Sequence, residues 1–539
     1  MPILNWLTRN EDVQATKGVP YRLLEEVPRL SYGDKDAKNL IIQGDNLEAL
    51  KTLLPFYAGQ VKCIYIDPPY NTKSAFETYD DNLEHSQWLA MMWPRIELLK
   101  QLLTAENGVL LISINDDEAH YLKVICDEIF GRKGFVGSFV WHYEGNTDNQ
   151  ADIINYHEYV LVYSTTGAID APGVIDPNIP QTSKLYKTEI RNTIVKNGPK
   201  NPVSNVQLPA GFPASFEKGV ISKSSTNWPK FSDDVTVDNW RTVDTITASS
   251  GWSSKKILED FINSKCSAVL DSKGQKTEFV LTQTGAIEAV KKREQNKGHI
   301  VSVLRGFGTT NQMRLLLEKI GVKFTYPKPV DLISYLISVF TKDNDLILDS
   351  FAGSGTTGHA VSQLNEKEGT HRRYILIELD RDNAEKTIVP RMQRVINGCS
   401  DAGLEKHGGG FRFYRLGEKA FDENGRICSD ILFPVLAAHV WFSETTTPWG
   451  GKGKSPALGT HDGKGYALLY NGILGDKRPD GGNVLTSQTL QIIREKIEKF
   501  EKGFTGTLVV YGESSRMSDA RLKRENVIFK QTPYDVKAR

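Results

Sequence analysis

The sequence has few cysteines, no long apolar run and no excess of charge of either sign. Its five cysteines are widely spaced and form no C-x-x-C pair, which argues against a zinc site and a disulfide framework and favours a reducing, cytoplasmic setting. No apolar stretch is long enough to span a bilayer, and residues 1–10 lack the apolar core of a signal peptide, so no membrane partner is expected. Lysine and arginine (66) balance aspartate and glutamate (66), so any polyanion site must be a local patch.

The length of 539 residues predicts several domains, because one hydrophobic core rarely holds so long a chain. Strand and helix patterns alternate over residues 37–165 and again over 301–415, which predicts a parallel sheet covered by helices. Between them, residues 166–300 lose this periodicity and become rich in Pro, Ser, Thr, Asn and Lys, as an inserted domain would. Residues 1–36 resemble an arm of mixed polarity, and residues 416–539 are expected to form a small α/β module.

Local patterns predict individual elements. Asp45 or Asn46 can cap a helix that begins with the pattern after them. Pro94 lies within a helical pattern and is expected to kink or break that helix. Two β-rich runs, at residues 135–144 and 157–164, are expected to pair as a hairpin.

The inserted region contains three tryptophans in polar surroundings, Trp228, Trp240 and Trp252. Their pattern favours core anchors of a small domain over base-stacking residues, and both interpretations stay open. Basic segments between Lys184 and Lys297 fit either solvated loop charge or contacts to phosphates.

A glycine-rich turn follows an apolar strand in the second alternating segment. Gly353, Gly355 and Gly358 have the G-x-G-x-x-G spacing, which permits a tight turn and lets a ligand approach a helix N-terminus. Glu378 ends the next strand, where a carboxylate can bind ribose hydroxyls. This turn alone fits NAD, FAD or S-adenosylmethionine, or a turn without a ligand, so an oxidoreductase is one alternative. No lysine follows the glycines, which argues against a P-loop.

A second motif, Asp67-Pro68-Pro69-Tyr70, ends a strand-forming run near the start of the chain. Prolines stiffen a loop and leave carbonyls as acceptors, and the aspartate adds a further acceptor. Tyr70 offers a flat face on which a planar ring can stack. This combination predicts a holder for an amino group on an aromatic ring, such as a nucleobase.

Methyl transfer to such an amine explains both motifs. Hydrogen bonds to Asp67 and a proline carbonyl would orient the nitrogen and stabilise the positive charge that grows on it. A base inside a duplex cannot be reached, so it would have to be flipped out.

These motifs resemble the amino-methylating DNA methyltransferases, in their permuted β-group order with the catalytic tip first and the glycine turn last. The runs around residues 39–72 and the tail at 529–537 are similar to modification subunits of type III restriction–modification systems. The resemblance covers nearly the whole chain and is weak in the middle. It implies a circularly permuted, Rossmann-like S-adenosylmethionine-dependent fold, with residues 166–300 as a target-recognition domain.

The resemblance also implies roles for individual residues. The catalytic tip would be Asp67, Pro68, Pro69 and Tyr70. The residues that would bind S-adenosylmethionine are Asp45, Lys328, Pro329, Asp349, Phe351, Gly353, Gly355 and Glu378. His157 and Tyr159 would wall the flipped base or be ordinary strand residues, and no metal is expected.

The function implied is N6-adenine methylation of double-stranded DNA, by a homodimer that binds a restriction (Res) subunit. A cytosine-N4 methyltransferase is an alternative, although Asp67 favours adenine. A DNA-specificity subunit without catalysis is another, against which intact Asp67 and Tyr70 argue.

Overall fold

The computed structural model describes residues 3–34, 38–71, 84–143, 155–170, 172–183, 186–272, 274–292, 299–421, 428, 431–445, 447, 449–476 and 481–532. The chain divides into two compact units. One comprises residues 1–172 and 300–539, and the other comprises residues 173–299. The domain boundaries predicted from the sequence stay predictions, because residues 416–539 group by their contacts with the first unit.

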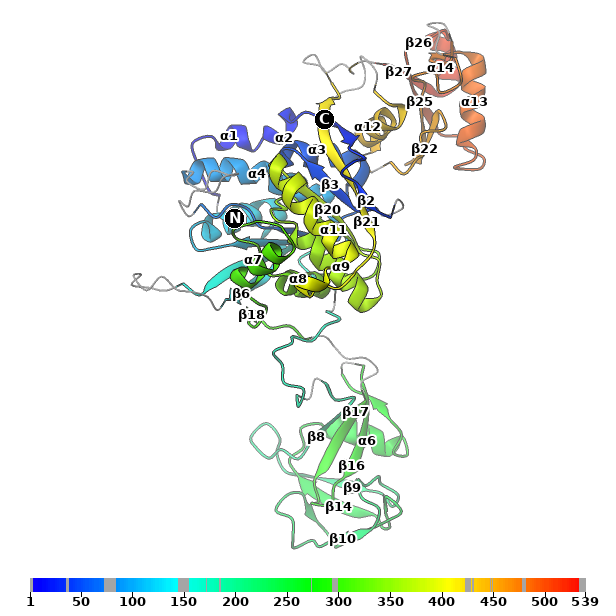
Figure 1. Ribbon diagram of the computed structural model, residues 1–539. Coiled ribbons are helices and arrows are strands. Elements are labelled where there is room, and N and C mark those ends of the chain that lie inside the picture. The colour runs from blue at the N-terminus through cyan, green and yellow to red at the C-terminus, as the bar shows by residue number, and fades with distance from the viewer. Residues whose placement is uncertain are drawn as a thin grey trace. The chain divides into compact units, whose positions relative to one another are not determined.

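An eleven-stranded sheet forms the centre of the first unit (Figure 1). Its strand order is β1 (Arg22–Glu26), β21 (Gly410–Lys419), β3 (Leu40–Gln43), β20 (Arg373–Glu378), β19 (Leu346–Asp349), β4 (Cys63–Ile66), β5 (Val109–Ile114), β7 (His157–Ser164), β6 (Phe135–His142) and β18 (Val303–Leu304), with β2 (Tyr32–Gly33) paired to β21. Neighbouring strands from β21 to β5 are parallel. Because β19 and β20 insert between β3 and β4, the predicted permuted, Rossmann-like sheet is confirmed.

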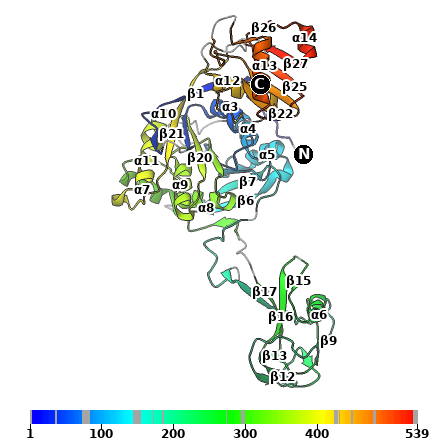
Figure 2. The ribbon, with the colours of Figure 1, turned by 90° about the vertical axis from the view of Figure 1, so that its right-hand side faces the viewer.

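Two groups of helices cover the sheet, and Figure 2 shows them on opposite sides of it. The first group packs together around α4 and contains α1 (Arg9–Asp12), α2 (Ala15–Gly18), α3 (Asn46–Tyr57), α4 (His85–Leu102) and α5 (Ala119–Phe130). The second contains α8 (Val330–Phe340), α9 (Thr356–Glu368) and α11 (Val389–Asn397), with α7 (Thr310–Lys319) and α10 (Arg381–Asn383) nearby in sequence. No helix in the described part of the chain is both long and apolar enough to cross a membrane.

Alternation along β4 shows how the sequence builds both faces. Ile64 and Ile66 are fully buried in the core that also contains Leu53 of α3 and Trp88 of α4. The intervening strand residues point to the opposite face, because successive side chains of a strand alternate. Both faces are therefore apolar, as a strand covered by helices on each side requires.

Pro94 was expected to kink or break its helix, and it does not break it, since α4 runs unbroken from His85 to Leu102. Pro94 is itself buried, and Trp88, Leu98 and Leu99 on the same helix are fully buried. Burial of large apolar side chains contributes about 2 kcal/mol each, which outweighs the loss of one helical hydrogen bond.

The N-terminal arm and the predicted hairpin both belong to the sheet. The arm of mixed polarity is part of the sheet, because β1 pairs antiparallel with β21. The paired strands β6 and β7 confirm the predicted hairpin.

The C-terminal end of the first unit contains both helices and strands, while its separation as an α/β module stays a prediction. Its elements are α12 (Phe433–Thr445), β22 (Ala457–His461), β23 (Lys464–Leu468), β24 (Val484–Leu485), α13 (Ser487–Ile497), β25 (Thr507–Gly512), β26 (Ser514–Ser515), α14 (Asp519–Arg524) and β27 (Val527–Gln531). Residues 533–537 of the tail that resembles type III subunits lie outside the described residues.

In the second unit, residues 173–299, the described residues form short antiparallel sheets and one α-helix around a core of their own. Its elements are β8 (Glu189–Thr193), β9 (Ser204–Leu208), β10 (Gly219–Ile221), β11 (Lys230–Phe231), β12 (Val235–Asp238), β13 (Arg241–Thr242), β14 (Ile246–Ser250), α6 (Lys255–Asn263), β15 (Val269–Leu270), β16 (Lys276–Leu281) and β17 (Ile287–Lys292). Lys184 and Lys297, which delimit the predicted basic region, lie outside the described residues.

Only one of the three tryptophans of this unit is a core anchor. Trp252 is buried, and its indole N–H donates to the carbonyl of Ser204 at 2.9 Å. Trp228 and Trp240 are 40% and 50% exposed, so the preferred interpretation as core anchors is wrong for both. Polar surroundings in sequence do not reveal whether a tryptophan has partners in space.

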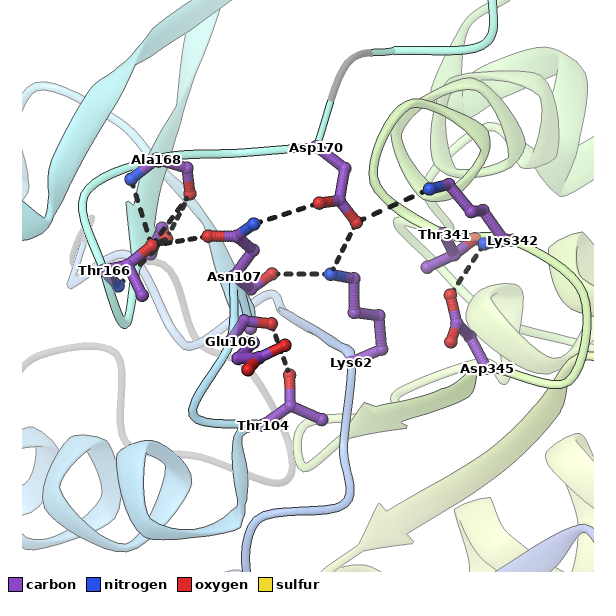
Figure 3. A network of polar contacts seen from close by, with 12 residues as sticks. Lys62, Thr104, Glu106, Asn107, Thr166, Ala168, Asp170, Thr341, Lys342 and Asp345 are labelled. Carbon is purple, nitrogen blue, oxygen red and sulfur yellow. Dashed lines mark hydrogen bonds and ion pairs between the residues drawn. The ribbon is translucent and has the colours of Figure 1, made fainter.

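A polar network fixes the segment that leads out of the first unit (Figure 3). The Lys62 ammonium donates to the carbonyl of Asn107 at 2.9 Å and to Asp170 at 3.0 Å. The Asn107 amide also donates to Asp170, and the Lys342 ammonium lies 3.8 Å from it. Lys62, Asn107 and Lys342 precede β4, β5 and β19, so this network lies at the amino edge of the parallel strands.

Candidate active site

The two motifs meet at the carboxyl edge of the sheet. Asp67 directly follows β4 and Asp349 ends β19, and these strands are parallel neighbours, with Ile347 opposite Cys63. The carboxyl ends of neighbouring parallel strands are the usual ligand site of such sheets, at the point where the strand order reverses. Motifs nearly three hundred residues apart in the sequence therefore form one site.

The D-P-P-Y tip is held by its neighbours. The Trp88 indole N–H donates to the carbonyl of Pro69 at 2.9 Å, which ties the loop to α4. The hydroxyl of Tyr70 lies 2.8 Å from an oxygen of Asp67. Among the residues that the structure describes, none donates to the carbonyl of Pro68. The tip therefore keeps one carbonyl and one carboxylate as fixed acceptors.

A buried glutamate supports the residue that follows the tip. Asn71, in the left-handed region at φ 60°, donates from its amide to Glu118 at 2.7 Å. The ring nitrogen Nδ1 of His85 lies 2.6 Å from the same oxygen. Burial raises the pKa of Glu118, which stands directly before α5. The sequence offered no signal for this residue beyond its position after a strand.

Lys328 and Glu158 complete the charged centre. The Lys328 ammonium lies 2.7 Å from Glu158, 2.8 Å from the Tyr70 hydroxyl and 3.4 Å from Asp67. The Tyr70 hydroxyl is also 2.9 Å from Glu158. Two carboxylates and one tyrosine therefore surround one cation, and the Trp141 ring lies 5.6 Å from it. Lys328, predicted on the cofactor side, places its side chain at the catalytic tip.

Burial and charge act against each other in this cluster. Burial raises the pKa of Asp67, and the Lys328 ammonium opposes that rise. Burial alone would lower the pKa of Lys328, but Asp67 and Glu158 outweigh it, so the pKa is raised and the side chain stays charged. Burial also raises the pKa of Tyr70, which keeps its hydroxyl protonated. A quarter of the Asp67 side chain stays exposed, so a ligand can reach it.

The glycine turn closes around two acids. Gly353 and Gly355 have φ of 52° and 79°, the left-handed region that favours glycine, and α9 begins directly after them. Glu378 accepts the backbone N–H of Gly353 at 2.8 Å. Asp349 accepts from the backbone N–H of Phe351 at 3.0 Å and from the hydroxyl of Thr357 at 2.5 Å. The hydrogen bonds to each acid therefore stabilise the conformation of the glycine turn.

A buried arginine supports this turn from behind and was not predicted. Arg391 of α11 is fully buried and donates to the carbonyl and hydroxyl of Ser354 and to the hydroxyl of Thr356. Burial lowers its pKa to about 9. Nothing in the sequence distinguishes it from the surface arginines of an amphipathic helix. Its position places a positive charge beneath the start of α9.

The other predicted residues surround the same edge. Asp45 caps α3 by accepting from the backbone of Leu47 and Glu48, and its other oxygen lies 3.3 Å from Arg95. Pro329 stands at the start of α8, and the carbonyl of Lys328 before it accepts from Thr356. Capping by Asp45, rather than by Asn46, is thus confirmed, and its role in cofactor binding stays a prediction.

The site's chemistry fits S-adenosylmethionine, a sulfonium cation with ribose hydroxyls. Burial raises the pKa of both Asp349 and Glu378 to about 7. Neither acid forms an ion pair with any described cationic side chain. Buried carboxylates without a cation are stabilised by hydroxyl donors and by a positively charged ligand. No cluster of His, Cys, Asp and Glu within the described ranges could hold a metal ion.

The two predicted wall residues and the acid between them lie on β7. Tyr159 donates its hydroxyl to Asp116 at 2.9 Å, and His157 lies 3.0 Å from Tyr159. The side chain of Glu158 lies on the opposite face of β7 and contacts Lys328 and Tyr70. A strand's period of two could have shown that Glu158 faces opposite to its neighbours, but not that it faces Asp67.

The chain is similar to several known proteins. A family model described as "DNA methylase" matches residues 61–388. The EcoPI Mod subunit of a type III restriction–modification enzyme from Escherichia phage P1 is 32% identical, over 70% of this chain and 63% of that protein. The EcoP15I Mod subunit of Escherichia coli is 27% identical, over 95% of this chain and 86% of its own length. The solved cytosine-N4-specific PvuII DNA methyltransferase is 13% identical, with a TM-score of 0.33 over 68% of this chain and 90% of that chain.

Proposed function

Since the chain belongs to the DNA methylase family, we propose that it transfers a methyl group from S-adenosylmethionine to N6 of adenine in double-stranded DNA. The observation that carries this proposal is the adjacency of Asp67 and Asp349 at the ends of neighbouring parallel strands. One motif presents acceptors for an amino group, and the other suits a nucleoside cofactor. The alignment spans 63% of the EcoPI Mod subunit, so the activity of a whole type III subunit is part of the proposal.

The residues of the tip would orient the attacking amine and stabilise the positive charge that develops on it. When bound, the cofactor supplies an electrophilic methyl group. Asp67 and the carbonyl of Pro68 would accept hydrogen bonds from the two N6–H groups. These hydrogen bonds would turn the lone pair of the nitrogen toward that methyl group. Positive charge that develops on N6 is stabilised by the Asp67 carboxylate, which already stands beside a second acid, Glu158. Tyr70 supplies a flat ring for stacking the flipped base.

Glu158 is a positioning residue in this scheme. It holds the Lys328 ammonium, which in turn lies within 3.4 Å of Asp67. Without Glu158, that ammonium would pair more strongly with Asp67 and compete with the substrate amine. A cation at that place also opposes positive charge on N6, so the second carboxylate is needed to offset it.

Adenine is favoured over cytosine because Asp67, an acid, occupies the first position of the tip. In cytosine-N4 methyltransferases this position is more often serine, whose hydroxyl accepts a hydrogen bond from an amine less strongly than a carboxylate does. The cytosine-N4 alternative rests on the same acceptor geometry.

Recognition of double-stranded DNA is assigned to residues 173–299. Within this range the sequence has 18 lysines and arginines against 13 aspartates and glutamates, although the whole chain is balanced. Phosphate contacts by such a unit would make affinity fall steeply with salt. From the names of the relatives, we further propose that the chain is a modification (Mod) subunit and binds a restriction (Res) subunit. A homodimer in the cytoplasm is proposed only from the resemblance of the sequence to that family.

Modification-sensitive sequencing of DNA from cells that express the chain tests the proposal. New N6-methyladenine at one short sequence is expected, and none should arise from the Asp67→Ala variant. N4-methylcytosine at that sequence would establish the alternative. A chain that binds S-adenosylmethionine but leaves no modified base would be a non-catalytic subunit, and the proposal would fail.

A further inference from the structure

The hairpin formed by β12 and β13 has an unusual residue at its tip. Its two-residue turn consists of Asn239 and Trp240, with φ of 48° and 62°. Two successive left-handed residues are typical of a type I′ turn, for which Asn followed by Gly is the common sequence. Asn239 fits this pattern, but Trp240 occupies the glycine position. A bulky residue in this region is strained, so the turn would be more stable without it.

The surrounding chain holds Trp240 in this conformation. Its backbone N–H donates to the carbonyl of Glu217 at 3.0 Å, and its carbonyl accepts from the N–H of Ala214 at 2.8 Å. The next residue, Arg241, donates from its guanidinium to the carbonyl of Gly211 at 2.8 Å. Strained residues persist only where such contacts fix them, and they gather at functional sites.

Packing does not explain the tryptophan. Half of the Trp240 side chain is exposed, and it does not belong to the core of its unit, whereas Trp252 is buried and hydrogen-bonded. The hairpin therefore has a strained turn whose indole is half exposed to solvent. An exposed aromatic ring on a fixed backbone is a feature with which proteins stack on unpaired bases or wedge between base pairs.

The charge of the unit identifies the partner. Residues 173–299 have five more basic than acidic residues, and a second exposed tryptophan, Trp228, lies 5.3 Å from the ammonium of Lys230. A positive unit with exposed aromatic rings suits a polyanion that carries flat bases. We propose that Trp240 contacts the bases of the target DNA, as a stacking or wedging residue at the tip of this hairpin. This inference rests on the proposed DNA methyltransferase function.

Replacement of Trp240 by glycine separates a DNA contact from a structural role. The Trp240→Gly change removes the indole and relieves the left-handed backbone, so the Tm of the full chain should stay the same or rise. Base–aromatic stacking contributes about 1–3 kcal/mol, so the Kd for DNA should increase roughly 5- to 100-fold. Trp240→Phe should recover most of the affinity. Asn239→Gly, the matched control, keeps the indole and should bind as the wild type does.

The measurements use the full chain with sheared, unmethylated bacterial genomic DNA, and they compare DNA binding, methyl incorporation and cofactor binding. Loss of DNA affinity with unchanged Tm and cofactor affinity supports the inference. Wild-type affinity of Trp240→Gly, in an enzyme that methylates DNA, overturns this inference alone. A Tm that falls in Trp240→Gly also overturns it, because the side chain would then be structural. If the wild-type chain neither binds nor methylates the DNA, the proposed function fails with it.

Discussion

Two sites, one in each unit of the chain, differ in how far their side chains are buried. In the first unit, Lys328 is almost entirely buried between Glu158 and Asp67, and Trp88 is fully buried while its indole holds the tip. In the second unit, Trp240 is half exposed at the tip of a hairpin. The Lys328 ammonium in the first unit is thus largely shielded from water, whereas the Trp240 ring in the second unit is accessible to it.

This difference matches two physical tasks. Stabilising charge on a small amine needs fixed acceptors in a site that excludes much of the water, because electrostatic interactions are stronger there. Contacting a long polyanion needs accessible groups and a net positive charge. Changes in the first unit should therefore alter the chemical step, and changes in the second should alter DNA affinity.

The largest expected effect is on catalysis alone. The Asp67→Ala change removes the acceptor at the tip, so methyl transfer should fall by about 10²- to 10³-fold, a loss typical of removing a charge-stabilising group. The Kd for DNA should stay within about twofold, measured by gel shift beside methyl incorporation. A parallel loss of DNA binding would mean that the tip is needed for the fold or for DNA contact, and would break the comparison.

Glu158 should have the next largest effect. Glu158→Gln keeps the shape but removes the charge that holds Lys328 away from Asp67, so kcat should fall about 10- to 100-fold with little change in KM for DNA. Tyr163→Phe is the matched control, because Tyr163 also lies on β7 and its hydroxyl donates to Asp127 of α5 rather than to a residue of the tip. Steady-state methylation over a range of DNA concentrations separates kcat from KM. Equal losses in both variants would show that β7 has only a structural role.

Much of this site followed from the sequence, because short-range patterns encode it. A strand that ends in Asp67, and another that ends in Asp349 before a glycine turn, are local signals that parallel sheets place at one edge. Glu158, Glu118 and Arg391 could not be found in this way. Each acts through contacts set by strand order and helix packing, which depend on distant parts of the chain.

The fold shows the same division. Alternating patterns predicted the parallel strands, and an arm of mixed polarity did not predict β1, which needs β21 as its partner. Pro94 was expected to kink or break α4 on local grounds, and tertiary burial kept the helix unbroken. Trp228 and Trp240 of the second unit were misjudged, and Trp252 was not, because exposure depends on neighbours in space.

The next effect concerns pH and the cofactor. Burial raises the pKa of Glu378 from an ordinary value near 4.5 to about 7, so the carboxylate ionises as the pH rises through 7. Ionised Glu378 accepts hydroxyl hydrogen bonds more strongly, so the affinity for S-adenosylmethionine should rise about tenfold between pH 6 and pH 8. Calorimetry at several pH values measures this, and Glu378→Gln should bind weakly with a flatter profile. A flat profile in the wild type would contradict a role of Glu378 in cofactor binding.

The same pKa shift affects the stability of the unliganded chain. Between pH 4.5 and 7 the folded state keeps a proton on Glu378 that the unfolded state has lost. Stability from this group therefore falls as the pH rises through that window and is constant above it. Asp349, with its pKa raised to about 7 from 3.8, acts in the same direction.

The smallest effect should come from the network at the amino edge, remote from the carboxyl edge. Hydrogen bonds from Asn107, together with those from Lys62, lower the pKa of Asp170, so this carboxylate is ionised and stabilising at neutral pH. About a third of its side chain is exposed, and solvent screening limits the contribution to about 0.5–1 kcal/mol. Asp170→Ala should therefore lower the Tm by about 2 °C. Methylation per folded molecule should stay unchanged, because none of the described hydrogen bonds joins this network to the tip or to the glycine turn. Thermal unfolding beside a methylation assay tests this, with Asp170→Asn expected to recover part of the Tm through retained hydrogen bonds. A large loss of kcat in Asp170→Ala would show that the two edges of the sheet are coupled, and the separation between chemistry at one edge and anchoring at the other would not hold.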